Sequence, residues 1–181
     1  MTSRLKPALS DRDHLLGDRR APIVMCEFGD YQCPYCGRAH GVTKALERAL
    51  GERLAFAFRH FPLSGAHPHA MLAAEAAEAA GAQGKFWAMH DLLYTHQDAL
   101  TRPDLTQYAL ALNLDLGQFE DDLGTHCFLE RIRADVHAGA LSGVNGTPTF
   151  FIDGVRYDGA RDFETMWGAL MGAAGAATLP G

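Results

Sequence analysis

Two cysteines three residues apart, Cys33 and Cys36, separate a short apolar run from a segment with helical spacing. The run Pro22–Phe28 has the length and the bounding residues of a buried strand, and residues 39–50 repeat apolar side chains at helical intervals. A cysteine pair in this position is a metal half-site, a structural disulfide or a dithiol that cycles with its disulfide. The sequence therefore predicts a strand, a turn and a helix, with both sulfur atoms where the helix begins.

Composition narrows the class of protein. The chain has 181 residues, 48% of them hydrophobic, so it can bury the core of one domain or of one domain with an insertion. A formal net charge of -6 argues against nucleic acid as a partner, and no apolar run reaches the roughly 18–20 residues of a membrane span. The amino-terminal residues lack the apolar core of a secretory signal. We therefore expect a cytoplasmic protein, or a periplasmic or extracellular one if a signal has been removed.

Strand patterns occur near both ends of the chain and helical patterns occur between them. Residues 53–61 alternate as a second strand, with Leu54, Phe56 and Phe58 on one side, which completes a βαβ unit with parallel strands. Asp153-Gly154 predicts a hairpin turn between two antiparallel strands, Thr149–Ile152 and Val155–Tyr157. A closing helix over 162–171 and a frayed tail over 173–181 complete the prediction.

A stretch without strand signals, His67 to Gly143, is rich in helix formers and contains five amphipathic segments. We predict that residues 1–62 and 144–181 form one domain and that residues 63–143 form an inserted helical domain. Phe86, Trp87 and Met89 belong to its core. The apolar faces of these helices must be covered, so we expect the insertion to pack on the sheet and to contribute the surface over the cysteine pair.

The cysteine pair meets the physical requirements of a redox centre. At a helix start, Cys33 lies near unbonded backbone N–H groups and the positive end of the helix dipole, and both favour a thiolate. Pro34 suits the first helical position because its missing N–H is not needed there. Cys36 follows about one turn later, close enough to form a short disulfide. We therefore predict a pKa for Cys33 well below the usual value of about 8.5.

Three separated blocks of sequence carry a family resemblance. They read G-D-Y-Q-C-P-Y-C-G, A-A-E-A-A-G-A-Q-G-K-F-W-A-M-H-D-L-L and G-V-N-G-T-P-T-F-F-I-D-G, in that order. Over roughly residues 20–165 the chain resembles DsbA-like thiol:disulfide oxidoreductases of the thioredoxin superfamily, in the Thioredoxin_4 or FrnE-like branch. The resemblance implies an α/β thioredoxin fold (βαβ…ββα) with a large helical insertion.

The resemblance also implies roles for individual residues. Cys33 would be the exposed nucleophile and Cys36 the resolving cysteine. A loop facing the disulfide would contain a cis proline and leave backbone groups free to pair with an extended substrate. The residues implied in substrate contact are Pro34, Tyr35, Gly146, Thr147 and Pro148. The implied partners are protein thiols and disulfides, with glutathione as a second candidate, and neither a cofactor nor a metal is implied.

Glu27 occupies the position at which members of this family often keep a buried carboxylate beneath the active site. In a strand that ends at Phe28, the side chains of Cys26 and Glu27 point to opposite faces. A buried carboxylate has a raised pKa and can exchange a proton with the resolving sulfur of Cys36. The alternative is a solvated carboxylate at the rim of the sheet.

A zinc site is the first alternative for the cysteine pair. Such a site needs four ligands, and the chain has one C-x-x-C pair. His60, His67 and His69 could supply the remaining ligands. The segment His67-Pro68-His69 more simply marks the start of a helix, with its histidines solvated at the helix end.

The sequence also predicts roles for the two other cysteines and for the residues that flank the pair. Cys26 and Cys127 are predicted to be small buried core residues, with a redox role for Cys127 as the alternative. Asp30 and Tyr31 flank the pair, and Asp30 either shapes substrate access or is solvated at the rim.

Glutathione-dependent isomerases and kappa-type transferases use the same scaffold but need no resolving cysteine. The presence of both Cys33 and Cys36 favours disulfide exchange.

The two residues between the cysteines influence the reduction potential. Pro34-Tyr35 resembles the pairing in glutaredoxins, whereas many strongly oxidising DsbA-type enzymes have a histidine next to the second cysteine. Tyr35 carries no positive charge to stabilise the Cys33 thiolate. We therefore predict an intermediate potential, roughly -150 to -230 mV. The pattern leaves open the direction of exchange in the cell, the native substrates and the oligomeric state.

Overall fold

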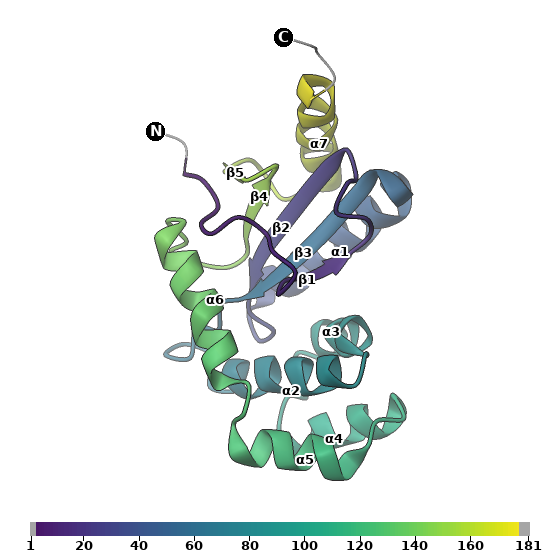
Figure 1. Ribbon diagram of the computed structural model, residues 1–181, viewed down its shortest axis with the longest axis vertical. Helices are drawn as coiled ribbons and strands as arrows, with labels where there is room; N and C mark the ends of the chain where they lie inside the picture. Colours follow the sequence, from purple (N-terminus) through teal and green to yellow (C-terminus); the bar gives the residue numbers. More distant parts are fainter. Residues whose placement is uncertain (1–2, 178–181) are drawn as a thin grey trace.

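The computed structural model describes residues 3–177 as a five-stranded mixed sheet with helices on both faces and a cluster of helices at one end (Figure 1). The strands are β1 (His14–Leu16), β2 (Ile23–Gly29), β3 (Leu54–His60), β4 (Thr149–Ile152) and β5 (Val155–Tyr157). The helices are α1 (Pro34–Leu50), the 3-10 turn η1 (Gly51–Arg53), α2 (Ala70–Ala82), α3 (Phe86–Thr95), α4 (Arg102–Ala111), α5 (Leu116–Thr125), α6 (Leu129–Leu141) and α7 (Phe163–Ala177).

The strand order β1-β3-β2-β4-β5 places the two halves of the chain in one sheet. β2 and β3 are parallel and joined through α1, as the βαβ prediction requires. β4 pairs antiparallel with β2 and with β5, and Asp153 and Gly154 turn the hairpin with φ angles of 47° and 74°. Both values lie in the left-handed region that a tight hairpin turn of this kind needs. The predicted βαβ and ββα halves are confirmed.

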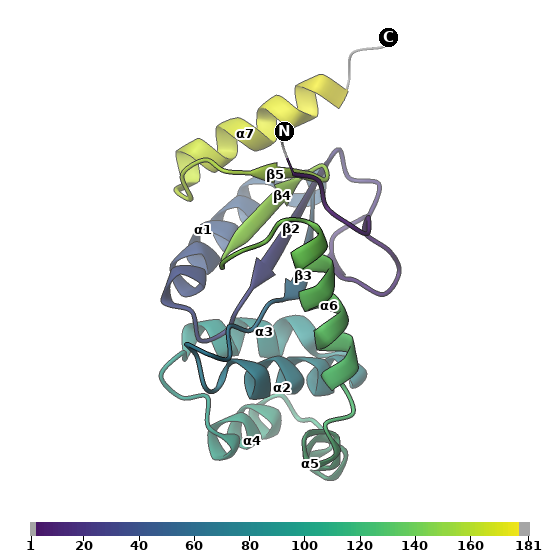
Figure 2. The same ribbon diagram turned by 90° about the vertical axis from the view of Figure 1, so that its left-hand side faces the viewer.

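The two faces of the sheet are covered by different helices (Figure 2). Alternation along β2 sends Ile23 and Met25 to the face covered by α1 and α7, and Cys26 and Phe28 to the face covered by α6. Fully burying one large apolar side chain stabilises a fold by about 1.5–3 kcal/mol. Glu27 follows the same alternation, so its carboxylate points to the α1 face, where the cysteines lie.

The helical block packs against the end of the sheet that carries Cys33 and Cys36. Alanines line the buried side of α2, where small side chains let the neighbouring helices approach closely. One continuous apolar cluster contains Cys33 and Cys36 together with side chains of the helical block such as Met89 and Leu93. The expected contact between the block and the cysteine pair is confirmed. Within the same predicted insertion, α6 packs on β3 and covers a face of the sheet.

Two parts of the chain differ from the prediction. β1 was not predicted: it is three residues long and pairs antiparallel with β3 at the edge of the sheet, so tertiary pairing and not local pattern creates it. The tail was predicted to fray from residue 173, but α7 continues to Ala177. Alanine is the strongest helix former, and it outweighs the interspersed glycines. The rest of the predicted tail, 178–181, lies outside the described residues.

Candidate redox site

The two cysteines occupy different positions at the start of α1. Cys33 is the N-cap residue, with extended backbone angles (φ -72°, ψ 120°), and Pro34 takes the first helical position. Cys36 lies one turn further on and is completely buried. Cys33 is only 3% exposed, so the exposed position that the resemblance implied for it is wrong. The loop around Thr147 and the packed helical block cover most of its surface.

The pKa of Cys33 is lowered to about 5. The largest cause is a hydrogen bond from the Cys36 thiol to the Cys33 sulfur, and burial acts in the opposite direction. The thiolate gains further hydrogen bonds from Thr147 and from the backbone N–H groups of Cys36 and Tyr35. The helix start therefore contributes as predicted, but the neighbouring thiol contributes more.

Cys36 has the opposite ionisation. Burial raises the pKa of Cys36 well above the ordinary thiol value, and its hydrogen bond to Cys33 and the nearby Glu27 add to the shift. At neutral pH the pair therefore consists of one thiolate and one thiol. The thiolate is the nucleophile in disulfide chemistry, so this asymmetry suits Cys33 for attack and Cys36 for resolution.

Glu27 lies beneath the pair in the core of the sheet. Its neighbours across the sheet are Phe58 on β3 and Phe150 on β4. Its Oε1 atom is buried without a hydrogen-bond partner among residues 3–177. Burial raises the pKa of Glu27 to about 8, and the charge of Cys33 adds to this effect. The solvated-rim alternative is wrong, and the carboxyl is protonated through most of the neutral range.

The loop before β4 faces Cys33. The Thr147-Pro148 peptide bond is cis, the form that the resemblance implied. The Cys33 Sγ atom lies 3.5 Å from the Thr147 carbonyl oxygen, and the Thr149 hydroxyl donates to the Gly146 carbonyl oxygen at 2.7 Å. The structure thus brings Gly146, Thr147 and Pro148 to the cysteines. Tyr35 is 65% exposed on the same side.

Gln97, which the sequence did not predict, links the turn that contains Tyr31 and Cys33 to the helical block. Gln97, between α3 and α4, donates from Nε2 to the carbonyl oxygens of Tyr31 (2.8 Å) and Cys33 (2.9 Å). Gly37 makes this approach possible, because a Cβ atom there would lie 2.1 Å from Gln97 Oε1. No motif surrounds Gln97, so only the glycine after C-P-Y-C hinted at a close neighbour.

The Asp30 carboxylate stabilises the turn before α1 by accepting hydrogen bonds from it and from a neighbouring segment. It is buried, and its Oδ1 accepts from the Gln32 N–H at 2.8 Å. Its Oδ2 accepts from the Leu63 N–H at 2.8 Å and lies 2.7 Å from His67 Nδ1. The solvated-rim reading of Asp30 is therefore wrong. His67 is half-buried on this carboxylate, so the prediction of a solvated histidine is also wrong.

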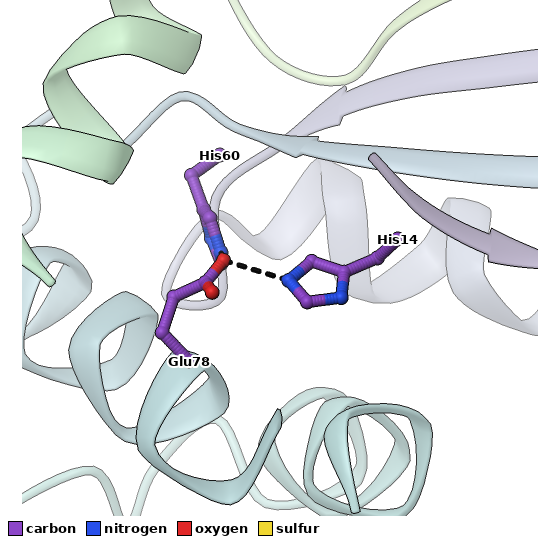
Figure 3. A group of neighbouring side chains, drawn as sticks. All are labelled: His14, His60 and Glu78. Atoms are coloured by element: carbon purple, nitrogen blue, oxygen red, sulfur yellow. Dashed lines mark hydrogen bonds and ion pairs between the residues drawn. The ribbon is translucent and has the colours of Figure 1, made fainter. Parts of the chain in front are cut away.

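The histidines considered for zinc do not converge on the cysteines. His60 is buried and lies with His14 around Glu78, and both Nε2 atoms are 2.8 Å from Glu78 Oε1 (Figure 3). Two separate groups of residues have ligand atoms close together: His14, His60 and Glu78, and His40, His90 and Asp91. Within each group these atoms lie within 4.8 Å of one another. In the first group, however, Arg131 Nε lies 2.7 Å from Glu78 Oε2. That positive charge already balances the carboxylate and opposes a second cation.

The two remaining cysteines differ from each other. Cys26 is a buried core residue, as predicted, and burial raises the pKa of its thiol. Cys127 is exposed, which makes its prediction as a core residue wrong. It follows the left-handed C-cap His126 of α5, in the connection to α6, and therefore lies on the surface.

Solved structures show the architecture to which the chain is similar. BdbD from Bacillus subtilis superposes with a TM-score of 0.84 at 19% identity, covering 97% of this chain and 98% of that one. α-DsbA1 from Wolbachia pipientis gives 0.80 at 22% identity, covering 93% and 94%. A thioredoxin-like oxidoreductase from Silicibacter pomeroyi DSS-3 gives 0.78 at 26% identity, covering 93% of each chain. The fold is the DsbA-like thioredoxin fold, and the predicted fold class is confirmed.

Sequence relatives place the chain in a family. A family model described as thioredoxin, Thioredoxin_4, matches residues 9–171, so the chain belongs to the Thioredoxin_4 family. Curated relatives include the Na⁺/H⁺ antiporter NhaA 3 of Salinispora tropica, 46% identical over 96% of this chain, and NhaA 1 of Mycobacterium sp. strain KMS, 43% identical over 92%. The chain spans only 26% and 27% of their lengths. No helix among residues 3–177 is both long and apolar enough to cross a membrane.

Proposed function

We propose that the protein is a thiol:disulfide oxidoreductase that works through Cys33 and Cys36. The observation that carries the proposal is the opposed ionisation of the two thiols. The pKa of Cys33 is lowered to about 5, and that of the buried Cys36 is raised well above normal. A structural disulfide would need no such difference, and a metal site would need further ligands at the pair.

In the reducing direction, the Cys33 thiolate attacks one sulfur of a substrate disulfide. The substrate S–S bond breaks, one substrate thiolate leaves, and a mixed disulfide forms at Cys33. Formation of the mixed disulfide removes the Cys33 charge that helps to raise the pKa of Glu27, so the ionised form of Glu27 becomes more populated. Cys36 then transfers its proton to the ionised Glu27 carboxylate and attacks the Cys33 sulfur, which releases the second substrate thiolate. The cysteine pair has lost two electrons, which the substrate gains as it becomes two thiolates, and the Cys36 proton stays on Glu27 until it passes to solvent or to a product thiolate. The oxidising direction reverses each step.

The loop of Gly146, Thr147 and Pro148 forms one wall of the substrate site, and Pro34 and Tyr35 form the other. Protein thiols and disulfides are the proposed partners, because extended chains can pair with exposed backbone groups beside the redox pair. The solved structures named above support this class of substrate through their fold. Ion transport, which the names of the longer relatives imply, is not proposed for this chain.

Trapping experiments test the proposal. The wild-type protein should reduce insulin or exchange with glutathione buffers, whereas Cys33→Ser should be inactive. Cys36→Ser should accumulate a mixed disulfide at Cys33 that mass spectrometry detects. Cys127→Ser is the matched control and should behave as wild type. Full turnover by Cys36→Ala would instead support the kappa-type glutathione transferase alternative, which needs one thiol.

Equilibration with glutathione redox buffers measures the potential. We propose a value of roughly -150 to -230 mV. A value below about -270 mV would make the protein a thioredoxin-like reductase, and one near -120 mV would make it a dedicated oxidase.

A further inference from the structure

A groove of about 670 Å³ lies beside the redox pair, between α1 and the segments around β4 and β5. Its lining includes the proposed substrate residues Tyr35, Gly146, Thr147 and Pro148. The groove has the size of a small-ligand pocket, about 300–1,000 Å³.

The groove is positively charged in a protein that is negative as a whole. Three arginines line it, from three elements: Arg38 on α1, Arg156 on β5, and Arg161 before α7. Arg156 is occupied, because it pairs with Asp158 at 2.8 Å and donates to the Gly143 carbonyl oxygen. The formal net charge of -6 would repel anions elsewhere. Among the described residues that line the groove, Asp162 is the one carboxylate, so the arginines outnumber it.

Arg38 and Arg161 are the two arginines with unused hydrogen-bond capacity. Both side chains are exposed, and neither guanidinium forms an ion pair or a hydrogen bond with any other residue in the described range 3–177. Arg38 is held in place by stacking on the Tyr35 ring, 4.5 Å from its centroid. Arg161 is near enough to the redox site that its charge acts on the buried Glu27. A guanidinium with free N–H groups is a ready partner for a carboxylate.

We infer that the groove binds a low-molecular-weight disulfide whose carboxylates flank its sulfur atoms, as in glutathione disulfide. Arg38 and Arg161 receive carboxylates, and the sulfur lies at Cys33. The inference rests on the proposed disulfide exchange. A small disulfide can occupy the groove alongside the proposed exchange with proteins, because the two free arginines lie on separate elements that bound a groove of limited volume.

The chemical step is the one proposed above, with this substrate named. The Cys33 thiolate attacks one sulfur of glutathione disulfide, the S–S bond breaks, and one glutathione thiolate leaves. Cys36 gives its proton to the ionised form of Glu27, attacks the Cys33 sulfur and displaces the second glutathione thiolate. One dithiol becomes one disulfide and one glutathione disulfide becomes two glutathiones, so the pre-reduced protein supplies both electrons in a single turnover.

Single-turnover oxidation of the pre-reduced protein tests the inference. Three disulfides differ mainly in charge: glutathione disulfide (anionic), hydroxyethyl disulfide (neutral) and cystamine (cationic). Acid quenching and mass spectrometry give the rate constant for each. The variants are Arg38→Gln, Arg161→Gln and the double variant. Arg48→Gln is the matched control, because Arg48 is exposed on the same helix and does not line the groove.

Each groove variant should slow oxidation by glutathione disulfide about two- to fivefold, the range of exposed charge pairs, and the double variant about tenfold. Hydroxyethyl disulfide should be unaffected and cystamine should react faster. The wild-type preference for the anion should weaken with added salt. Arg48→Gln should match wild type for all three.

An equal loss with all three disulfides, no loss, or the same loss in Arg48→Gln would overturn the inference. A disulfide of two short acidic peptides that reacts faster than glutathione disulfide, with the same dependence on the arginines, would overturn the assignment to a small substrate. Failure of every disulfide to oxidise the protein would instead refute the proposed function.

Discussion

Glu27 and Glu78 are both buried, with exposed fractions of 1% and 4%, but they lie in regions of different construction. Glu27 lies under the redox pair, with one oxygen unpartnered within residues 3–177. Glu78 lies where the sheet meets the helical block, and three side chains contact its carboxylate. His14 and His60 contact Oε1 (Figure 3). Arg131 contacts Oε2. These partners come from β1, β3 and α6.

The two carboxyl groups ionise in opposite ways as a result. Burial raises the pKa of Glu27 to about 8. Burial would also raise the pKa of Glu78, but hydrogen bonds from His14 and His60 hold it well below its usual range. Burial alone therefore does not decide the charge of a carboxyl group. One region uses its carboxylate to join three elements, and the other leaves its carboxyl free to exchange a proton.

Removing the carboxylate at the junction should have the largest effect. Glu78→Ala leaves buried positive or polar partners unpaired, so we expect a loss of about 3–5 kcal/mol in the free energy of unfolding. Urea denaturation at pH 7 measures it. Because the folded-state pKa is depressed, the loss should shrink as the pH falls below about 4.5. Glu130→Ala, which breaks the exposed pair with Arg133 on α6, is the control and should cost less than about 1 kcal/mol.

Removing the ionisable group under the cysteine pair should act in the other direction. With its pKa raised from 4.5 to about 8, Glu27 costs stability as the pH rises through that window, because the folded state holds the proton more tightly. Glu27→Gln should therefore stabilise the reduced protein by about 3 kcal/mol at pH 7 and about 1 kcal/mol at pH 5. It should also slow resolution by Cys36. A variant less stable than wild type at pH 7 would contradict the comparison.

Thiolate titration sharpens the comparison next. The absorbance of the reduced protein should show a midpoint near pH 5 for Cys33. Glu78→Ala should leave it unchanged because Glu78 is remote, and Glu27→Gln should leave it unchanged because Glu27 is already protonated at that pH. Cys36→Ala removes the largest cause of the shift, so its midpoint should rise toward the ordinary value of about 8.5. A midpoint that stays near 5 in Cys36→Ala would assign the shift to the helix start.

The smallest expected effect comes from the contact that links the helical block to the redox turn. Gln97→Ala removes two hydrogen bonds, to the carbonyl oxygens of Tyr31 and Cys33. At about 0.5–1.5 kcal/mol for each bond, we expect a loss of about 1–3 kcal/mol, measured by urea denaturation. Gln107→Ala, on the exposed side of α4, is the control. Equal stability of Gln97→Ala and wild type would show that packing alone joins the two parts.

Local patterns were sufficient to predict most of the fold. C-P-Y-C after an apolar run predicted a strand and a helix start, Asp153-Gly154 predicted a hairpin, and alternation in β2 predicted that Cys26 and Glu27 point to opposite faces of the sheet. Each of these signals acts within a few residues of the chain. The resemblance placed the loop of Thr147 and Pro148 opposite the cysteines, which no local pattern could do.

Features made by distant residues were not predictable in the same way. β1 exists because β3 offers a free edge, and Gln97 matters because Gly37 leaves room for it. The convergence of His14 and His60 on Glu78 joins segments that no spacing rule relates. The burial of Asp30 and the exposure of Cys127 likewise depend on which elements pack against them.

The redox site is assembled from segments made at very different times during synthesis. Thr147 lies 114 residues after Cys33, and β4, which follows it, pairs with β2 in the middle of the sheet. The ribosome must therefore deliver the whole helical block before the sheet and the wall of the substrate site can be completed. Such long-range pairing is slow to form. A nascent chain that ends before β4 carries both cysteines without the thiolate's partner at Thr147, so the full reactivity of Cys33 reports that folding is finished.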